Sequence, residues 1–140
     1  EFSWLFGRRT YDDLLPYWNR TGGPFQEGLN QPRKYVVSSD AARELTWPNS
    51  VLVSGDVAGA IAGLRREEGG NLVVMGSGQL VRSLLPHGLV DELLLMVHPV
   101  VLGSGQRLFG PDDALRRFEL LSATPAASGV IATRYRSAGA

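Results

Sequence analysis

A continuously apolar segment, residues 71–75, runs directly into the glycine-rich turn Gly76-Ser77-Gly78. A run of this kind is typical of a strand that is buried on both faces of a parallel sheet. Apolar residues then recur at helical spacing from residue 80 to 85, and residues 56–68 before the strand show the same period. Because alternating helices and strands pack as parallel strands with right-handed crossovers, this part of the chain predicts an α/β fold.

Three further apolar runs predict strands: residues 4–6, 34–39 and 50–54. The first ends at Gly7, and a helix is expected from residue 11 to residue 15, where Pro16 would end it. Residues 16–32 are rich in proline and glycine, so we expect a loop that could border a ligand.

The C-terminal part of the chain has a different pattern. Residues 91–102 are β-rich but contain Pro99, which predicts a bulge or a strand end. Residues 117–122 and 130–135 alternate apolar with polar side chains around a turn that contains Gly129. This pattern predicts an antiparallel hairpin that closes the sheet.

Composition excludes several classes of function. The chain has 140 residues, the size of one domain, with 14 Lys and Arg against 14 Asp and Glu, and its arginines are scattered. A basic stripe for nucleic acid is therefore not expected. The absence of cysteine rules out disulfides, thiol catalysis and cysteine-ligated metals, and two histidines offer little for a metal site. The first residues lack the features of a signal peptide or a membrane span, so we expect a cytoplasmic protein without a membrane partner.

The turn at Gly76 and Gly78 has the context of an anion site, because glycines allow close approach and the first helical N–H groups point at the ligand. It does not match the dinucleotide fingerprint G-x-G-x-x-G, since Val81 occupies the place of the third glycine. The Gly-Lys-Ser/Thr ending of a P-loop is also missing. A tight strand-to-helix turn without a ligand explains the glycines as well.

Two other strand ends carry groups suited to phosphate. Gly7-Arg8-Arg9-Thr10 combines a helix start with two guanidinium groups, although an exposed helix start with solvated arginines is an equal alternative. Ser38 and Ser39 follow another strand, where capping of a short helix at residues 41–45 is the simpler explanation. Three parallel strands would bring these turns to one edge of the sheet, where open α/β sheets bind ligands.

Four segments, taken in order, carry a resemblance: residues 5–11 (LFGRRTY), 34–38 (KYVVS), 74–78 (VMGSG) and 99–109 (PVVLGSGQRLF). The chain resembles the dihydrofolate reductase-like superfamily, in the branch of the reductase domain of the bacterial riboflavin-biosynthesis deaminase-reductase and its stand-alone relatives. The resemblance implies one domain over residues 1–140, with a three-layer fold, a mainly parallel sheet and an antiparallel C-terminal hairpin. It places the first strand of the family, and an acidic residue facing the substrate, upstream of Glu1. We therefore expect the printed sequence to be an incomplete account of the gene product, because removing a buried central strand would leave its two neighbours without hydrogen-bond partners. The alternative is a protein that lacks this strand and its substrate site.

The resemblance also implies a function: NADPH-dependent hydride transfer to a small heterocyclic substrate of the pterin, folate or pyrimidine type. The alternative is an NADPH-binding sensor or scaffold without catalysis. The residues implied to bind the cofactor are Gly7, Arg8, Arg9 and Thr10 at its phosphates, Ser38 and Ser39 at the adenosine and its 2′-phosphate, and Gly76, Ser77, Gly78, Gln79 and Leu80 at the pyrophosphate and nicotinamide ribose. Trp18 and Pro99 are candidate substrate residues, although packing is the commoner role for such a tryptophan. Homodimers are frequent in this branch, so a homodimer is expected.

Overall fold

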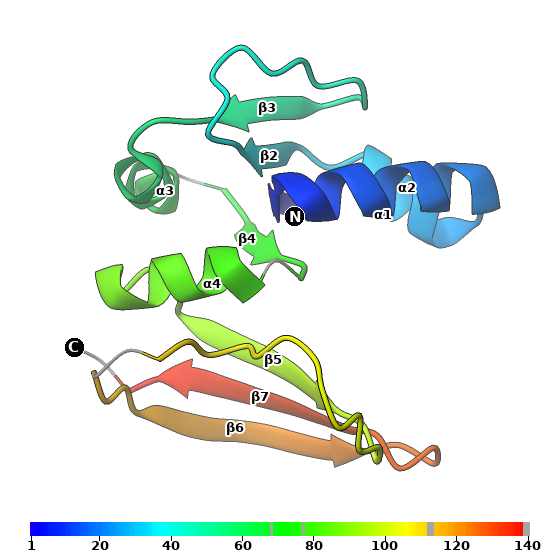
Figure 1. Cartoon of the computed structure of the whole chain (residues 1–140), viewed down its shortest axis with the longest axis vertical. Coiled ribbons are helices and arrows are strands. Elements are labelled where there is room, and N and C mark those ends of the chain that lie inside the picture. Colours follow the sequence, from blue (N-terminus) through cyan, green and yellow to red (C-terminus); the bar gives the residue numbers. More distant parts are fainter. Residues whose placement is uncertain (68, 77, 112–113, 139–140) are drawn as a thin grey trace. The chain divides into compact units, whose positions relative to one another are not determined.

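The computed structural model of the chain describes residues 1–67, 69–76, 78–111 and 114–138 (Figure 1). It consists of two compact units, Glu1–Val81 and Arg82–Ala140. The first unit contains, in chain order, β1 (Phe2–Gly7), α1 (Arg8–Thr21), α2 (Pro24–Asn30), β2 (Lys34–Val37), β3 (Ser50–Val53), α3 (Val57–Arg66) and β4 (Asn71–Val74). Helix α4 (Gly78–Leu84) spans the boundary between the units, and the second unit adds the 3-10 turn η1 (Leu85–His87), β5 (Glu92–Val97), β6 (Phe118–Pro125) and β7 (Ile131–Ser137). That all 140 residues form one domain stays a prediction.

The strands of the first unit form a parallel sheet in the order β3-β2-β1-β4. Each of them coincides with an apolar run that the sequence predicts as a strand. In the register of the sheet Gly7 pairs with Val37, and Leu5 pairs with Val74. The carboxyl ends of β1, β2 and β4 therefore meet at one edge of the sheet, and the predicted α/β class is confirmed.

Helices cover both faces of this sheet. Val36 of β2 is wholly buried on one face, in a cluster with Leu15 of α1 and Leu29 of α2. Adjacent residues of a strand point to opposite faces, so Tyr35 lies on the other one. There it lines a cavity together with Leu64 of α3. The helical period over residues 56–68 is confirmed by α3, and the Asp56 carboxylate caps its start by accepting the N–H of Gly59 at 3.0 Å.

Helix α1 does not end at Pro16, as the sequence predicts, but continues through it to Thr21. Proline lacks the N–H that would bond one turn back, which costs about 3 kcal/mol in a helix interior. That bond would have reached the Asp12 carbonyl, and side chains of the next turn add hydrogen bonds to the main chain further along the helix. Asn19 donates from Nδ2 to the Leu15 carbonyl at 2.7 Å, and Thr21 donates from Oγ1 to the Tyr17 carbonyl at 2.9 Å. The buried face that begins before the proline also extends past it.

The prediction that residues 16–32 form a loop is also wrong, because α1 and α2 occupy most of this stretch. Gly22 and Gly23 have φ angles of 75° and 94°, which end α1 in a conformation that glycine adopts without strain. Pro24 is the first residue of α2, where its missing N–H costs nothing. The glycines and prolines of this stretch therefore mark the boundary between two helices.

The second unit contains an antiparallel sheet in the order β5-β7-β6. The C-terminal hairpin is confirmed, with Gly129 in its turn, but it pairs with β5 in a three-stranded sheet instead of closing the parallel one. Strand β5 ends two residues before Pro99, in agreement with the predicted strand end. Both β4 and β5 lie at an edge of their sheet.

Tyr11 connects α1 to the edge strand β3 and the segment before it, and it provides a test of this packing. Its side chain is 2% exposed, and its hydroxyl bonds the Ser50 hydroxyl at 2.8 Å and accepts the N–H of Trp47 at 3.1 Å. We expect Tyr11→Phe to lower the free energy of unfolding by about 1–3 kcal/mol, because a buried N–H loses its acceptor. Urea denaturation measures this change. Tyr17→Phe is the matched control, since Tyr17 is 52% exposed and its variant should unfold like the wild type.

Candidate functional site

The turn after β1 combines positive charge with a helix start. Gly7, which has no side chain with which to cap the helix, is the N-cap of α1, and the first turn of the helix contains no acidic residue. Arg8 and Arg9 are exposed, and neither forms a salt bridge with any residue that the structure describes. Two guanidinium groups at the positive end of a helix dipole create a local field that favours an anion.

The turn after β4 lies directly against the turn after β1. Gly76 has a φ of 67°, and a Cβ atom placed on it would lie 3.5 Å from Oγ1 and 3.6 Å from Cγ2 of Thr10. The two glycine turns that the sequence predicts as separate phosphate loops are therefore neighbours. A side chain at residue 76 would strain the backbone at this φ, and its Cβ would be in van der Waals contact with Thr10.

The other residues predicted for this turn differ in what they present. Gly78 and Gln79 begin α4, and Gln79 is exposed. Leu80 is only 6% exposed, so its side chain belongs to the interior and is not available to a ligand. Ser77 lies outside the described residues.

Ser38 and Ser39 follow β2 at the same edge of the sheet. Ser38 is 5% exposed; its N–H donates to the Val53 carbonyl at 3.1 Å, and its hydroxyl accepts the N–H of Asp40 at 3.2 Å. Ser39 is exposed. The short helix that the sequence offers as an alternative at residues 41–45 does not form. Asp40 instead makes a turn, in which its carboxylate accepts the N–H of Ala42 at 2.9 Å.

The two candidate substrate residues have packing partners. Trp18 contacts Phe25 edge-on, with ring centroids 4.7 Å apart, and packs against the core of the first unit. Pro99 belongs to the second unit and lies beside the hairpin turn, where a Cβ on Gly129 would be 3.1 Å from its Cγ. These contacts give each residue a structural role, and substrate contact stays a prediction for both.

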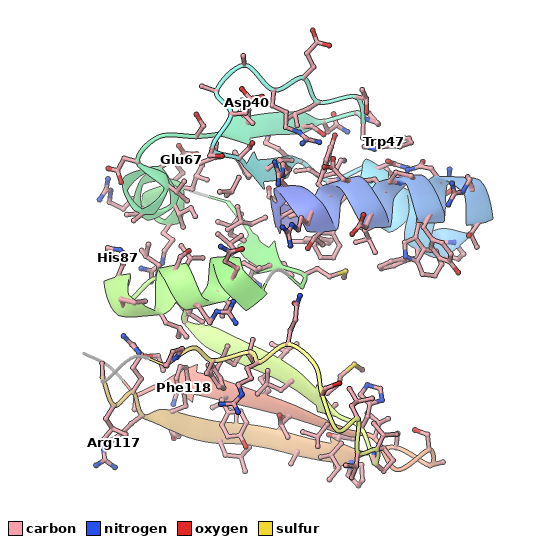
Figure 2. The ribbon with its side chains drawn as sticks, in the orientation of Figure 1. Asp40, Trp47, Glu67, His87, Arg117 and Phe118 are labelled. Atoms are coloured by element: carbon pink, nitrogen blue, oxygen red, sulfur yellow. The ribbon has the colours of Figure 1, made fainter. Side chains whose placement is uncertain are left out.

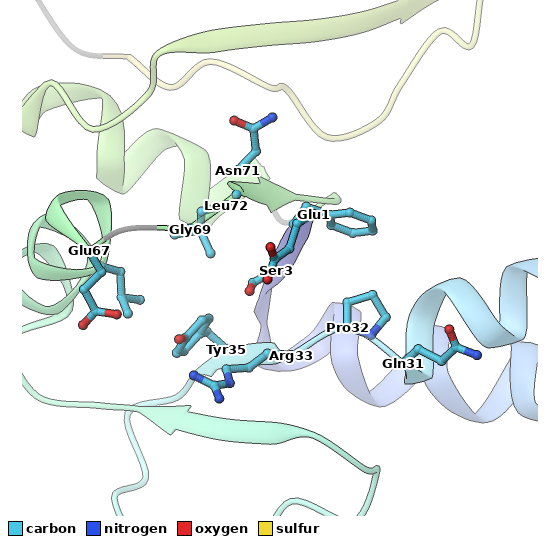
Figure 3. A pocket seen from close by; sticks show the side chains of 13 residues that line it. Glu1, Ser3, Gln31, Pro32, Arg33, Tyr35, Glu67, Gly69, Asn71 and Leu72 are labelled. Atoms are coloured by element: carbon cyan, nitrogen blue, oxygen red, sulfur yellow. The ribbon is translucent and has the colours of Figure 1, made fainter.

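A cavity of about 630 Å³ opens at the other end of the parallel sheet, between the amino ends of its strands and the connection from α3 to β4 (Figure 3). Tyr35 of β2 and Arg33, the residue before β2, line this cavity. Glu67, the residue after α3, lines it as well. A hydrogen bond with Tyr35 raises the pKa of Arg33. Ligands of open α/β sheets bind at the carboxyl ends of the strands, so this cavity is distinct from the candidate edge.

Two observations concern metals and membranes. Within the described ranges, no three histidine, cysteine, aspartate or glutamate side chains gather in a way that would hold a metal ion. No helix in the same part of the chain has the length and apolar content to cross a bilayer.

A profile described as the RibD C-terminal domain matches residues 3–132. The chain belongs to the RibD C-terminal domain family. Two relatives come from Bacillus subtilis strain 168, and both are described as uncharacterized. YyaP is 26% identical over 136 residues, which cover 94% of this chain and 71% of YyaP. YwjB is 42% identical over 113 residues, which cover 75% of this chain and 56% of YwjB.

Solved structures show the same fold. A putative riboflavin biosynthesis protein from Shewanella sp. PV-4 superposes with a TM-score of 0.78 at 23% identity, over 96% of this chain and 73% of that one. Dihydrofolate reductase from Enterococcus faecalis, in a complex with NADP(H) and RAB-propyl, superposes with a TM-score of 0.68 at 14% identity, over 98% of this chain and 74% of that one. RibD from Acinetobacter baumannii superposes with a TM-score of 0.66 at 15% identity, over 96% of this chain and 46% of that one. The RibD C-terminal branch, which the four sequence segments predict, is confirmed by the family match, and these structures confirm the dihydrofolate reductase-like fold.

Proposed function

We propose that this chain binds NADPH along the carboxyl edge of β2, β1 and β4 and transfers a hydride from it to a small heterocyclic substrate. The observation that supports the proposal most directly is the contact between Gly76 and Thr10, which joins two phosphate-suited turns into one surface. The turn at Ser38 and Ser39 continues this surface along the neighbouring strand. The fold is of the reductase type, and its relative from Enterococcus faecalis is a complex with NADP(H).

The donors along this edge fit an extended, polyanionic ligand. Arg8, Arg9 and the first N–H groups of α1 would hold a pyrophosphate, while Ser38 and Ser39 would lie at the adenosine end. The glycine at residue 76 would let the ligand approach the main chain. NADPH supplies the hydride, and the protein supplies its orientation.

Titration of the purified protein with NADPH by calorimetry tests the binding step. We expect saturable binding that is tighter for NADPH than for NADH. Absence of heat at millimolar NADPH would refute the proposal. Turnover assays with pterin, folate and ribitylaminopyrimidine-type substrates test the second step, and binding without turnover of any of them would favour the sensor or scaffold alternative.

We also propose that the chain forms a homodimer. Several large apolar side chains of β5 and the segment after it are exposed, with 74% for Leu94, 70% for Met96 and 80% for Leu102. Leu94 and Met96 share one face of β5, and exposed apolar side chains that lie together in this way mark protein interfaces. We expect light scattering after size exclusion to give twice the monomer mass at micromolar concentration, and Leu94→Asn to weaken the dimer. A monomer under these conditions would contradict the proposal.

A further inference from the structure

Arg43 lies in the connection between β2 and β3, four residues after Ser39. The N–H of Arg43 donates to the Asp40 carbonyl at 3.2 Å, which closes a tight turn over residues 40–43. Figure 2 labels Asp40 in this connection and Trp47 at its other end. The main chain of Arg43 is thereby held beside the carboxyl end of β2.

The guanidinium of Arg43 reaches from this turn to α1, where it binds the carboxylate of Asp12. Asp12 follows Arg8 by four residues, and residues at this spacing share one face of a helix. A third positive group therefore stands between the serines after β2 and the helix face that carries Arg8.

The Asp12 contact uses little of what the guanidinium offers. A guanidinium has five N–H donors in a planar fork, yet the Nε of Arg43 is buried and finds no acceptor among the described residues. An unsatisfied buried donor of this kind calls for an explanation. A phosphate monoester accepts two parallel N–H bonds, which a single carboxylate oxygen does not.

A purely structural role for the ion pair explains less. The two side chains are 23% and 42% exposed, and ion pairs with this much solvent contribute little to stability. The connection is already held to α1 at its far end, where the N–H of Trp47 donates to the Tyr11 hydroxyl. The position of Arg43 beside the serines is thus not needed for anchoring the loop.

We propose that Arg43 binds the phosphate on the adenosine ribose of the cofactor, exchanging the carboxylate of Asp12 for this phosphate monoester. The inference rests on the proposed function and assigns the preference for a 2′-phosphate to a residue that neither turn motif contains. Asp12, Asp40 and the adjacent Glu44 are carboxylates close to Arg43 along these elements, and all three oppose an anion. Asp12 holds the guanidinium in place until the phosphate arrives.

The test compares two fragments, 2′,5′-ADP and 5′-AMP, by calorimetry on the full chain. We expect Arg43→Met to weaken 2′,5′-ADP at least 10-fold and to leave 5′-AMP within 2-fold, with partial recovery in Arg43→Lys, which keeps the charge and loses the fork. Asp12→Asn should strengthen 2′,5′-ADP, because the guanidinium no longer has a competing carboxylate. Arg20→Met, in the last turn of α1, is the matched control and should change neither fragment.

Distinct outcomes separate this inference from the proposed function. If Arg43→Met weakens both fragments equally, or neither, the inference is overturned while NADPH binding stands. If the wild type binds neither NADPH nor 2′,5′-ADP, the proposed function itself fails. Circular dichroism of each variant confirms that it is folded before titration.

Discussion

Lys34→Ala is expected to lower the free energy of unfolding by about 3–5 kcal/mol, because the variant leaves a cavity and removes the donor to two partly buried carbonyls. Lys34 is wholly buried at the start of β2. Its ammonium donates to the Asn30 carbonyl at 2.8 Å and to the Pro32 carbonyl at 3.0 Å. These carbonyls belong to the C-terminal end of α2 and the segment after it, so the lysine ties this helix to the sheet.

Lys34→Met separates the two contributions, since methionine fills a similar volume and donates nothing. We expect this variant to lose about 1–3 kcal/mol, the cost of the missing donor alone. The Asn30 carbonyl keeps a partner in both variants, because Nδ2 of Asn49 donates to it at 3.0 Å. Urea denaturation at pH 7 measures both values, and wild-type stability in Lys34→Ala would contradict the prediction.

The same lysine should make stability depend on pH. Burial lowers the pKa of Lys34 to about 8, whereas an unfolded lysine has a pKa of about 10.4. Between these values the unfolded chain binds a proton that the folded chain does not, so stability should rise from pH 8 to pH 10 and stay flat just below pH 8. Lys34 is the single lysine of the sequence. The rise should therefore disappear in Lys34→Met, and an identical pH profile in both proteins would refute the assignment.

Local patterns were enough for the parallel sheet and for the turns at its edge. An apolar run followed by glycine encodes both a buried strand and the sharp turn after it, as at residues 71–76, and neither feature depends on distant contacts. The meeting of Gly76 with Thr10 follows from the pairing of β1 with β4, which a parallel sheet makes natural. The pairing of the C-terminal hairpin with β5 could not be predicted from the sequence, because the order of strands in a sheet has no local sequence pattern.

Contacts between segments far apart in the sequence could not be predicted in this way. Pro16 signals a helix end locally, but the burial of Leu15 and the side chains of the next turn outweigh it. The role of Lys34 depends on α2, a helix that the sequence analysis missed. Arg43 is 31 residues from Asp12, and nothing in the residues around it marks a binding group.

Replacing both arginines after β1, in the double variant Arg8→Gln/Arg9→Gln, is expected to weaken NADPH at least 100-fold. Each guanidinium that makes a charge-assisted hydrogen bond to phosphate contributes about 1.5–3 kcal/mol, and a factor of 100 corresponds to about 2.8 kcal/mol. Neither arginine forms a salt bridge among the described residues, so their loss should leave the free energy of unfolding nearly unchanged.

The matched control is Arg65→Gln/Arg66→Gln, which removes the same two charges from the last turn of α3. If overall charge attracted the cofactor, the two double variants would lose affinity for NADPH equally. High salt would then lower the affinity of the wild type as much as either double substitution does. If the turn after β1 holds the pyrophosphate, only the first variant loses affinity, and it does so for NADH as well as NADPH because both carry a pyrophosphate. A loss confined to NADPH would instead place these arginines at the 2′-phosphate and remove that role from Arg43. The pair of ligands and the pair of variants thus divide the edge of the sheet into a part that binds any dinucleotide and a part that selects the phosphorylated one.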